Sequence, residues 1–276
     1  MNLFSYKRRQ TQRGKNKAAL PNRELLLSYQ VANLQGLGAR ERQEDAFAFV
    51  NVMDVSKIRK DGLLAVVADG MGGMKDGKLA SETVIAGLKQ DFGEMDREND
   101  LAQQLCQSVF DAGEKVYGLL NGDGGSTVVA CIIFREQLYF VSVGDSFLYL
   151  KRGQELIRLN REQNCQAQTY LETIRSGSMD PTAAHNHREK AALTQFLGMD
   201  GMDEMDFLRR PFHMKDEDVL LICSDGVGGV LTEQELIVCL GEENPDRMCA
   251  AIEEKIRQHD ETYQDNYTAL IIKCGY

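Results

Sequence analysis

Between residues 126 and 159 the chain carries four short apolar segments joined by three residues or fewer. These segments are STVVACIIF, QLYFVSV, FLYLKRG and ELIRL. A crossover between parallel strands needs a dozen or more residues, so consecutive strands with such short links must run antiparallel. The pattern therefore excludes an all-helical or all-parallel fold for this region and predicts an antiparallel meander.

Helical periodicity surrounds this strand region. Apolar residues three or four positions apart predict helices over 76–93 and 97–120. A capping box from Thr232 to Glu235 predicts another helix, and the pair Asn244-Pro245 predicts a last one that ends near His259. Further strands are predicted at SYQVANLQGLG, DAFAFVNV, LLAVVA, DVLLICSDG and YTALIIKC. No internal repeat or low-complexity linker divides the chain, so we expect one layered domain of antiparallel sheets and amphipathic helices.

Charge is distributed unevenly along the 276 residues. Residues 1–23 carry seven Lys or Arg and no acid, whereas the remainder carries 25 basic and 42 acidic residues, a net charge of −17. We therefore expect residues 1–24 to form a basic, disordered arm and residues 25–276 to form the folded domain. The polar stretch 160–192, with one short helical patch, is predicted to be a mobile excursion from this domain. The acidic body excludes nucleic acid as its partner and suits divalent cations.

Localisation follows from what the sequence lacks. No window approaches the roughly 18 consecutive apolar residues of a membrane span, and the N-terminal stretch has no secretion signal. The seven cysteines form no Cys-x-x-Cys pair, and Cys131 and Cys223 lie inside apolar runs, as reduced core thiols do. We therefore expect a cytoplasmic protein, acting as a monomer, without disulfides or zinc.

Carboxylates mark the ends of the predicted strands. An Asp-Gly step after a strand is an ordinary turn, so DGMGG at 69–73 alone would indicate only a turn. Five predicted strands, however, begin or end on an acidic residue: Glu44 and Asp45, Asp69, Asp145, Asp225, and Asp265. Carboxylates gathered at one sheet edge repel one another, so a cation is expected between them.

The chemistry of these residues favours hard divalent cations. Mg²⁺ and Mn²⁺ bind carboxylate, carbonyl and water oxygens, and the glycines after Asp69 would let a main-chain carbonyl approach the ion. Two such ions can activate a water molecule for in-line attack on phosphorus. The reaction also needs a cation for the phosphate oxygens, which either Arg40 or Arg42 could provide. The sequence therefore predicts hydrolysis of a phosphate ester.

Seven motifs in order resemble the metal-dependent protein phosphatases of type 2C, the PPM family, and especially its bacterial members. They are RERQED, VVADGMGG, GGSTVVACII, VSVGDS, LTQFLG, LLICSDGV and DNYTALII. The resemblance implies an α+β fold, a four-layer α-β-β-α sandwich of two antiparallel sheets flanked by helices. It also implies that residues 160–192 are the flap that varies with substrate.

The resemblance assigns roles to the acidic residues by matching motifs. Asp69 would bridge two metal ions, Asp225 and Asp265 would complete one site, and the Gly70 carbonyl would serve the other. Glu44 and Asp45 would hold metal-bound waters, Asp145 would support a third, weaker ion, and Arg40 would bind phosphate. The implied substrates are phosphorylated proteins, with a serine/threonine kinase as the opposing partner.

Some positions depart from the family pattern. Met71 stands where many eukaryotic members have a histidine proposed as general acid, so protonation of the leaving serine oxygen would be left to water or would not be needed. Phe147 and Gln195 stand where arginine is usual, and LNREQN lacks the common Asp-His. These departures concern substrate preference more than the metal ligands.

Two other functions are compatible with parts of the sequence. An inactive pseudophosphatase would bind metal and recognise phosphoproteins without turnover, although the intact ligand set argues against it. A nucleotide-binding loop at DGMGG is disfavoured because the spacing is not Gly-x-Gly-x-x-Gly and the following strands are antiparallel.

Overall fold

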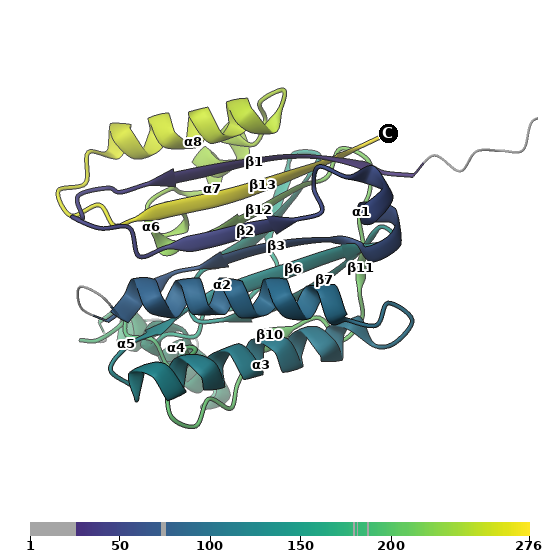
Figure 1. The fold of residues 1–276 in the computed structure, drawn as a ribbon. Helices are drawn as coiled ribbons and strands as arrows, with labels where there is room; N and C mark the ends of the chain where they lie inside the picture. Colours follow the sequence, from purple (N-terminus) through teal and green to yellow (C-terminus); the bar gives the residue numbers. More distant parts are fainter. Residues whose placement is uncertain (1–25, 73–75, 179, 181, 187) are drawn as a thin grey trace, which may run out of the picture.

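The computed structural model describes residues 26–72, 76–178, 180, 182–186 and 188–276, so the predicted basic arm (1–24) lies outside the described residues. Two antiparallel sheets form the centre of the molecule (Figure 1). The first has the order β1-β13-β12-β8-β9, with bounds Ser28–Gly36, Tyr267–Gly275, Val219–Cys223, Phe147–Arg152 and Glu155–Arg158. The second has the order β10-β7-β6-β3-β2, with bounds Asp206–Phe207, Gln137–Val143, Val128–Phe134, Leu63–Ala68 and Ala46–Val50. The described residues also form three two-residue strands outside these orders: β11 (Phe212–His213), which pairs with β7, and β4 (Gly70–Met71), which pairs with β5 (Gly125–Ser126).

Helices cover the outer face of each sheet. In Figure 1, α2 and α3 lie along the second sheet and α8 lies over the first. The helices are α1 (Val55–Asp61), α2 (Asp76–Glu94), α3 (Leu101–Leu120), α4 (Cys165–Arg175), α5 (Thr182–His185), α6 (Asp225–Gly228), α7 (Glu233–Cys239) and α8 (Pro245–His259). The four-layer α-β-β-α sandwich predicted from the family resemblance is confirmed. The predicted caps are also present, because Thr232 and Glu235 form a capping box and Asn244 caps α8 before Pro245.

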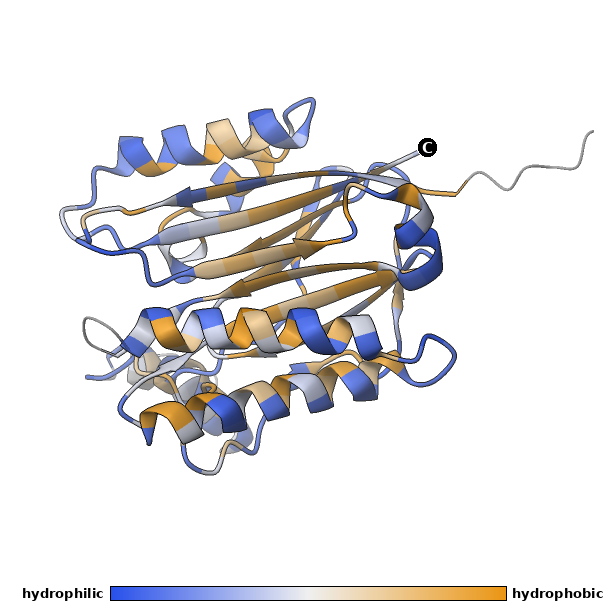
Figure 2. Cartoon of the chain, in the orientation of Figure 1, coloured by the Kyte–Doolittle hydropathy of each residue, from blue (hydrophilic) through white to orange (hydrophobic). Residues whose placement is uncertain are grey.

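Three apolar layers hold these four layers together. One lies between α2, α3 and the second sheet, one between the first sheet and α6 to α8, and one between the two sheets. Strand β3 shows why its sequence is continuously apolar: Leu63, Ala65 and Val67 face the other sheet, and the residues between them face the helices. Both faces of this strand are therefore covered, unlike a strand with one side in water. Figure 2 shows the corresponding concentration of hydrophobic residues in the strands.

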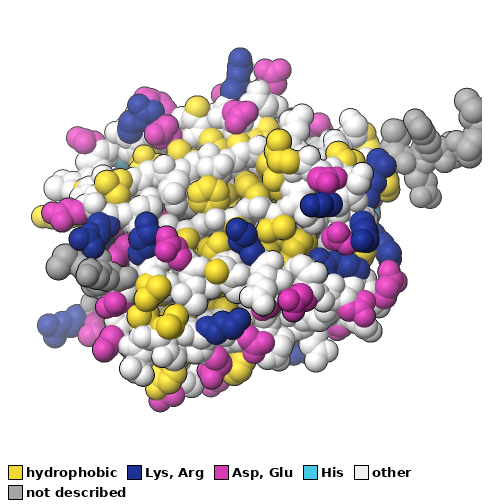
Figure 3. All heavy atoms as spheres, in the orientation of Figure 1, with side chains coloured by type: hydrophobic (Ala, Val, Ile, Leu, Met, Phe, Trp, Pro, Cys, Tyr) yellow, Lys and Arg dark blue, Asp and Glu magenta, His cyan; other side chains and the backbone are white. Residues whose placement is uncertain are grey.

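The charged surface is mixed on the face that carries α2 and α3. Figure 3 shows basic and acidic side chains interspersed there rather than collected into regions of one sign. All seven cysteines are free thiols, and Cys131 and Cys223 are buried in strands as predicted. None of the helices in the described ranges combines the length and the apolar character needed to cross a bilayer.

The predicted four-strand meander is wrong in one respect. β6 pairs with β7 in the second sheet and β8 pairs with β9 in the first, but β7 and β8 do not pair. The three residues 144–146 carry the chain from one sheet to the other, and Gly144 has φ 101°, in the region that favours glycine. The inner side chains of β7 and β8 then pack in the same layer between the sheets. The meander is therefore two hairpins joined by a crossing, and Asp145 lies at that crossing.

The polar stretch 160–192 is also more regular than expected. The predicted helical patch is α4, whose first turn is capped by the Asn164 side chain accepting from the Ala167 N–H at 2.9 Å. A second, short helix, α5, follows it. Helix α1 was not predicted from sequence; its N-cap is Asp54, which accepts hydrogen bonds from the N–H groups of Ser56 and Lys57.

Candidate active site

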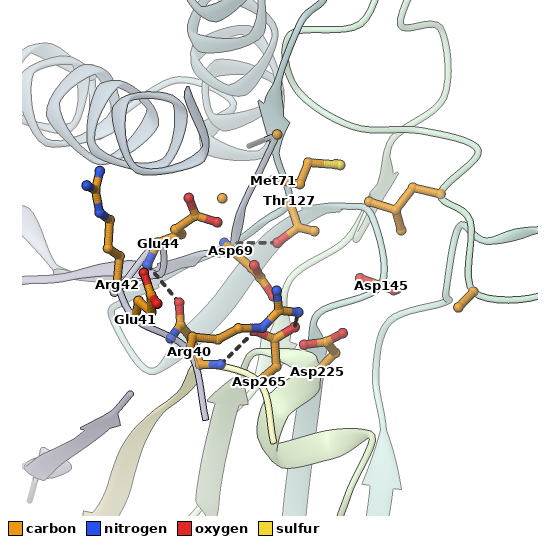
Figure 4. Close-up of a pocket in the computed structure, with 15 residues that line it drawn as sticks. Arg40, Glu41, Arg42, Glu44, Asp69, Met71, Thr127, Asp145, Asp225 and Asp265 are labelled. Atoms are coloured by element: carbon orange, nitrogen blue, oxygen red, sulfur yellow. Dashed lines mark hydrogen bonds and ion pairs between the residues drawn. The ribbon is translucent and has the colours of Figure 1, made fainter. Parts of the chain in front are cut away.

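A cavity of about 440 Å³ opens where several strand ends of both sheets meet. It is lined by six acidic residues from five segments: Glu41 and Glu44 before β2, Asp69 after β3, Asp145 between β7 and β8, Asp225 after β12, and Asp265 before β13. Figure 4 shows their carboxylates around a common space. The structure thus brings together acidic residues that are as much as 224 positions apart in the sequence.

Asp45, the remaining predicted acidic residue, is placed differently. It is buried, with 5% of its surface exposed, and is not among the residues that line the cavity. The Ser224 hydroxyl donates to Asp45 Oδ2 at 2.8 Å, one residue before Asp225. Asp45 therefore contributes its charge from behind the wall of the cavity rather than at its surface.

The cluster is electrostatically costly without a cation. Burial and then the Asp225 carboxylate together raise the pKa of Asp145 to about 7. Burial likewise raises the pKa of Asp45 to about 6 and that of Asp69 well above its ordinary range, with Asp45 and Asp225 adding repulsion at Asp69. The pKa of Asp225 is raised by burial and then by Asp265. A positive ion in the cavity would reverse these shifts by favouring the charged carboxylates.

Among the residues that the structure describes, two buried carboxylate oxygens have no hydrogen-bond partner. They are Asp45 Oδ1 and Asp225 Oδ1. Buried polar atoms are normally satisfied, so an unpartnered carboxylate oxygen fits the approach of a cation or its water. Within the described ranges, no three His, Cys, Asp or Glu side chains are arranged to enclose a metal ion by themselves. This donor set suits Mg²⁺ or Mn²⁺, which bind through one or two carboxylates and retain several waters.

Gly70 is required by close backbone packing. A Cβ at this position would lie 2.0 Å from the carbonyl oxygen of Gly77 and 2.7 Å from that of Glu44. The first turn of α2 and the entry to β2 can therefore approach Asp69 only because residue 70 has no side chain. The sequence suggested that the glycines would admit an ion, and the structure shows that Gly70 admits the neighbouring protein backbone; Gly73 lies outside the described residues.

Two arginines lie at the cavity. Arg40 Nη2 is 2.6 Å from Asp265 Oδ2, and both side chains are substantially exposed, at 58% and 40%. Arg42 lines the same cavity. The position of Arg40 beside an acidic residue of the cluster places a bidentate donor where a phosphate could approach the carboxylates.

A buried hydroxyl pair that the sequence did not single out fixes two of the strand ends. Thr127 Oγ1 accepts from the Asp69 N–H at 3.1 Å and is hydrogen-bonded to the Ser146 hydroxyl at 2.7 Å. The Thr127 N–H donates in turn to the Asp69 carbonyl at 2.8 Å. Because Ser146 directly follows Asp145, Thr127 ties the Asp69 and Asp145 segments together. The signal in the sequence was the polar pair at 126–127 at the entrance to a wholly apolar strand.

A second unpredicted residue, Asn266, ties two other ends together. Its Oδ1 accepts from the Glu44 N–H at 2.8 Å, and its Nδ2 donates to the Leu37 carbonyl at 2.9 Å. Because Asn266 adjoins Asp265, the entry to β2 is held beside the entry to β13. Its sequence signal was the Asp-Asn step before the last apolar strand.

The positions that depart from the family pattern have identifiable surroundings. Met71 lines the cavity. Phe147 lies beneath the Arg158 guanidinium, whose Cζ is 4.0 Å from the ring centroid. Gln195 Nε2 donates to Asp203 Oδ1 at 2.9 Å. The arginine at this place is therefore Arg158 of β9, which lies over residue 147, and not residue 147 itself.

Comparison with known proteins gives the family. The sequence profile described as Protein phosphatase 2C matches residues 38–260. The chain belongs to the protein phosphatase 2C family. The chain is 30% identical over 182 residues to Serine/threonine phosphatase stp of Listeria monocytogenes serovar 1/2a, covering 63% of this chain and 69% of that protein. It is 25% identical over 179 residues to Protein phosphatase PhpP of Streptococcus pneumoniae, covering 63% and 70% respectively.

Solved structures share the fold. The serine/threonine phosphatase of S. agalactiae has a TM-score of 0.75 at 24% identity, with 88% of this chain and 98% of that chain covered. The PPM Ser-Thr phosphatase MsPP from Mycobacterium smegmatis, solved in complex with cacodylate, has a TM-score of 0.69 at 27% identity, with 88% and 97% covered. This protein phosphatase 2C member is therefore a bacterial-type protein serine/threonine phosphatase, as the motifs predicted.

Proposed function

We propose that this phosphatase hydrolyses phosphoserine and phosphothreonine with two divalent cations, Mn²⁺ or Mg²⁺, held by Asp69, the Gly70 carbonyl, Asp225 and Asp265. The observation that carries the proposal is the convergence of six acidic residues on one cavity, with a raised pKa at Asp69 and, among the described residues, an unpartnered oxygen on Asp225. A related structure supports the cofactor: the catalytic domain of PstP, 21% identical and with a TM-score of 0.71, was solved with two manganese ions.

The cations would supply Lewis acidity and a water whose pKa is lowered toward neutrality, which is the chemistry that this set of oxygen donors can support. The chain positions its ligands rigidly, because Asp69 directly follows a buried strand, Asp225 lies two residues after another, and Asp265 closely precedes a third. Thr127 and Asn266 then hold these strand ends at fixed separations through their hydrogen bonds. Such preorganisation is the main requirement for electrostatic stabilisation of a transition state.

The remaining predicted residues have supporting roles in this proposal. Arg40 would move its guanidinium from Asp265 to the substrate phosphate, for which a charged fork provides both attraction and orientation. Glu44 at the cavity wall and Asp45 behind it would orient water and balance charge, and Asp145 would hold a third, weaker ion. Met71 has no proton to donate, so solvent would protonate the leaving serine or threonine oxygen.

In the cell, the proposed role is to reverse phosphorylation by a serine/threonine kinase. The experiment that tests the catalytic proposal measures p-nitrophenyl phosphate and phosphothreonine-peptide hydrolysis after EDTA treatment and dialysis, and then after addition of Mn²⁺ or Mg²⁺. We expect turnover to disappear on metal removal and to return with Mn²⁺. Calorimetric titration of the same protein with Mn²⁺ should show binding.

The outcomes separate the proposal from its alternative. Full turnover without metal would refute the metal-dependent mechanism. Mn²⁺ binding without turnover of either substrate would instead support a pseudophosphatase that acts as a phosphoprotein-binding module.

A further inference from the structure

One side of the segment 190–194 faces the carboxylate cavity. Ala191 and Leu193 line that cavity together with the acidic residues and Met71. A separate cavity of about 260 Å³ is lined by Asn164, Thr194 and their neighbours, but not by Leu193. The segment therefore separates the two cavities, with Leu193 on the side of the carboxylates.

The backbone of this segment pairs with the chain on one side. Leu193 and Asn164 form an isolated antiparallel bridge. The bridge is made by the residues that flank this pair: the Cys165 N–H donates to the Ala192 carbonyl at 2.9 Å, and the Thr194 N–H donates to the Gln163 carbonyl at 2.8 Å. In an antiparallel pair of this type, the two central residues direct their own N–H and C=O groups away from each other.

Leu193 therefore presents an open pair of backbone groups. Within the described part of the chain, neither its N–H nor its C=O takes part in a hydrogen bond, whereas its side chain is half-buried. Such a residue can exchange two hydrogen bonds with one residue of an added extended chain. This is the geometry by which an exposed edge binds a peptide as an extra strand.

We propose that the main chain of Leu193 binds the substrate backbone beside the phosphorylated residue. The Leu193 N–H donates to a substrate carbonyl, and a substrate N–H donates to the Leu193 carbonyl. The inference rests on the proposed function, because the cavity that Leu193 borders is the one that would receive the phosphate. Because Leu193 and the acidic residues line the same cavity, the occupant that fits both is an extended phosphopeptide.

The pairing restricts the class of substrate. A residue inside a helix has its backbone groups engaged, so the phosphorylated site must lie in an extended tail or loop. Residues directly opposite each other in such a pair place their side chains side by side. The substrate residue paired with Leu193 therefore meets the Leu193 side chain, and with Met71 on the same cavity this favours an apolar residue over a charged one.

A backbone methylation scan tests the hydrogen bonds directly. The probe is a nine-residue phosphothreonine peptide, prepared in versions that are each N-methylated at one backbone amide, and assayed with the full-length enzyme in Mn²⁺. Loss of one hydrogen bond corresponds to a change of about threefold to tenfold. We expect methylation of a single amide, within two residues of the phosphothreonine, to lower kcat/KM about tenfold through KM. If no amide position matters, the proposal is wrong.

Two variants at the same position separate backbone from side chain. Leu193→Pro removes the free N–H without breaking an existing hydrogen bond, and Leu193→Ala retains it. Leu193→Pro should lower kcat/KM for the unmethylated peptide about tenfold and make the methylation effect smaller, since both changes affect one pairing. Leu193→Ala should retain the methylation effect while losing the preference for an apolar neighbour. The methylation scan on the wild-type enzyme remains decisive if the proline variant folds poorly.

p-Nitrophenyl phosphate distinguishes this inference from the proposed function, because it has no peptide backbone. Its hydrolysis by the wild-type enzyme therefore tests the metal-dependent mechanism without the backbone pairing. If the wild-type enzyme does not hydrolyse it in Mn²⁺, the metal-dependent mechanism fails. If it does, but every methylated peptide reacts like the parent, only the backbone-docking proposal fails.

Discussion

Asp225→Asn should have opposite effects on stability with and without metal. Burial and the neighbouring Asp265 raise the pKa of Asp225, and the Asp225 charge in turn raises that of Asp69. Two charges 4 Å apart interact by about 4 kcal/mol at an effective dielectric constant of 20, which is an upper value for this partly protonated pair. An asparagine at 225 removes this repulsion and can donate an N–H to Asp69. We expect a gain of about 1 to 2 kcal/mol in EDTA, or about 2 to 8 °C in Tm.

The same substitution should nearly abolish catalysis. Loss of one charged group from a preorganised site typically costs at least about 100-fold in kcat, or about 3 kcal/mol. The variant should also lose most of the stabilisation that Mn²⁺ gives the wild-type protein, which is about 2.7 kcal/mol at 100 times the dissociation constant. Tm measured by calorimetry in EDTA and in Mn²⁺, with phosphopeptide turnover, checks all three effects.

Asp200→Asn is a matched control, because Asp200 is exposed and does not line the cavity. It should leave Tm and turnover unchanged in both conditions. The reasoning is refuted if Asp225→Asn lowers Tm in EDTA, which would mean that the carboxylate stabilises the metal-free fold. Wild-type turnover of phosphopeptide by this variant would equally remove Asp225 from the metal site.

Three further results are expected. Arg40→Ala should raise KM for phosphopeptide about tenfold or more while Mn²⁺ binding is retained, since a charge-assisted hydrogen bond to phosphate is lost; if calorimetry and kinetics show this pattern for Arg42→Ala instead, the role belongs to Arg42. In the metal-free fold the pKa of Asp45 is raised to about 6 and that of Asp145 to about 7. Protonation of these two carboxylates therefore stabilises the fold below about pH 4 relative to neutral pH, and this contribution is lost as the pH rises through 6 to 7. Tm in EDTA should therefore decline from pH 5 to 7.5 more steeply in wild type than in Asp145→Asn, and saturating Mn²⁺ should abolish the difference in slope. Gly70→Ala should lower Tm and activity together, because its Cβ would lie 2.0 Å from the Gly77 carbonyl oxygen; unchanged thermal denaturation would show that this contact relaxes freely.

The acidic residues of the cavity could be found from sequence because they occupy a recognisable position. Each predicted one lies at the end of an apolar segment, so the apolar run locates the strand and the acidic residue locates its end. The layered arrangement of sheets and helices could also be predicted from apolar runs. β3 is apolar at every position because helices cover one of its faces and a sheet covers the other. These features depend on local sequence, which is the information that periodicity contains.

The remaining features depend on partners that are distant in sequence. A three-residue link such as 144–146 permits either a hairpin or a crossing between sheets, and the choice depends on the layer in which β8 packs and on its pairing with β12. The hydroxyl pair Thr127 and Ser146 could be seen as polar residues beside strands, but not as bonded to each other across 19 positions. The direction of the Leu193 backbone N–H and C=O groups could not be predicted from sequence either, because it follows from hydrogen bonds made by the residues on either side of Leu193.

Apolar packing and charge repulsion have opposite effects on stability at the cavity. The apolar layers on both faces of the sheets hold the strand ends in place, and this burial brings six acidic groups into one space. The hydrogen bonds of Thr127 and Asn266 fix the backbone of those ends, yet they leave Asp225 Oδ1 without a partner. A site formed in this way is rigid before any cation enters it, so binding needs little rearrangement and relieves the repulsion already present. Metal affinity and metal-dependent stability should therefore change together across variants of the acidic residues, whereas variants of Leu193 should change neither.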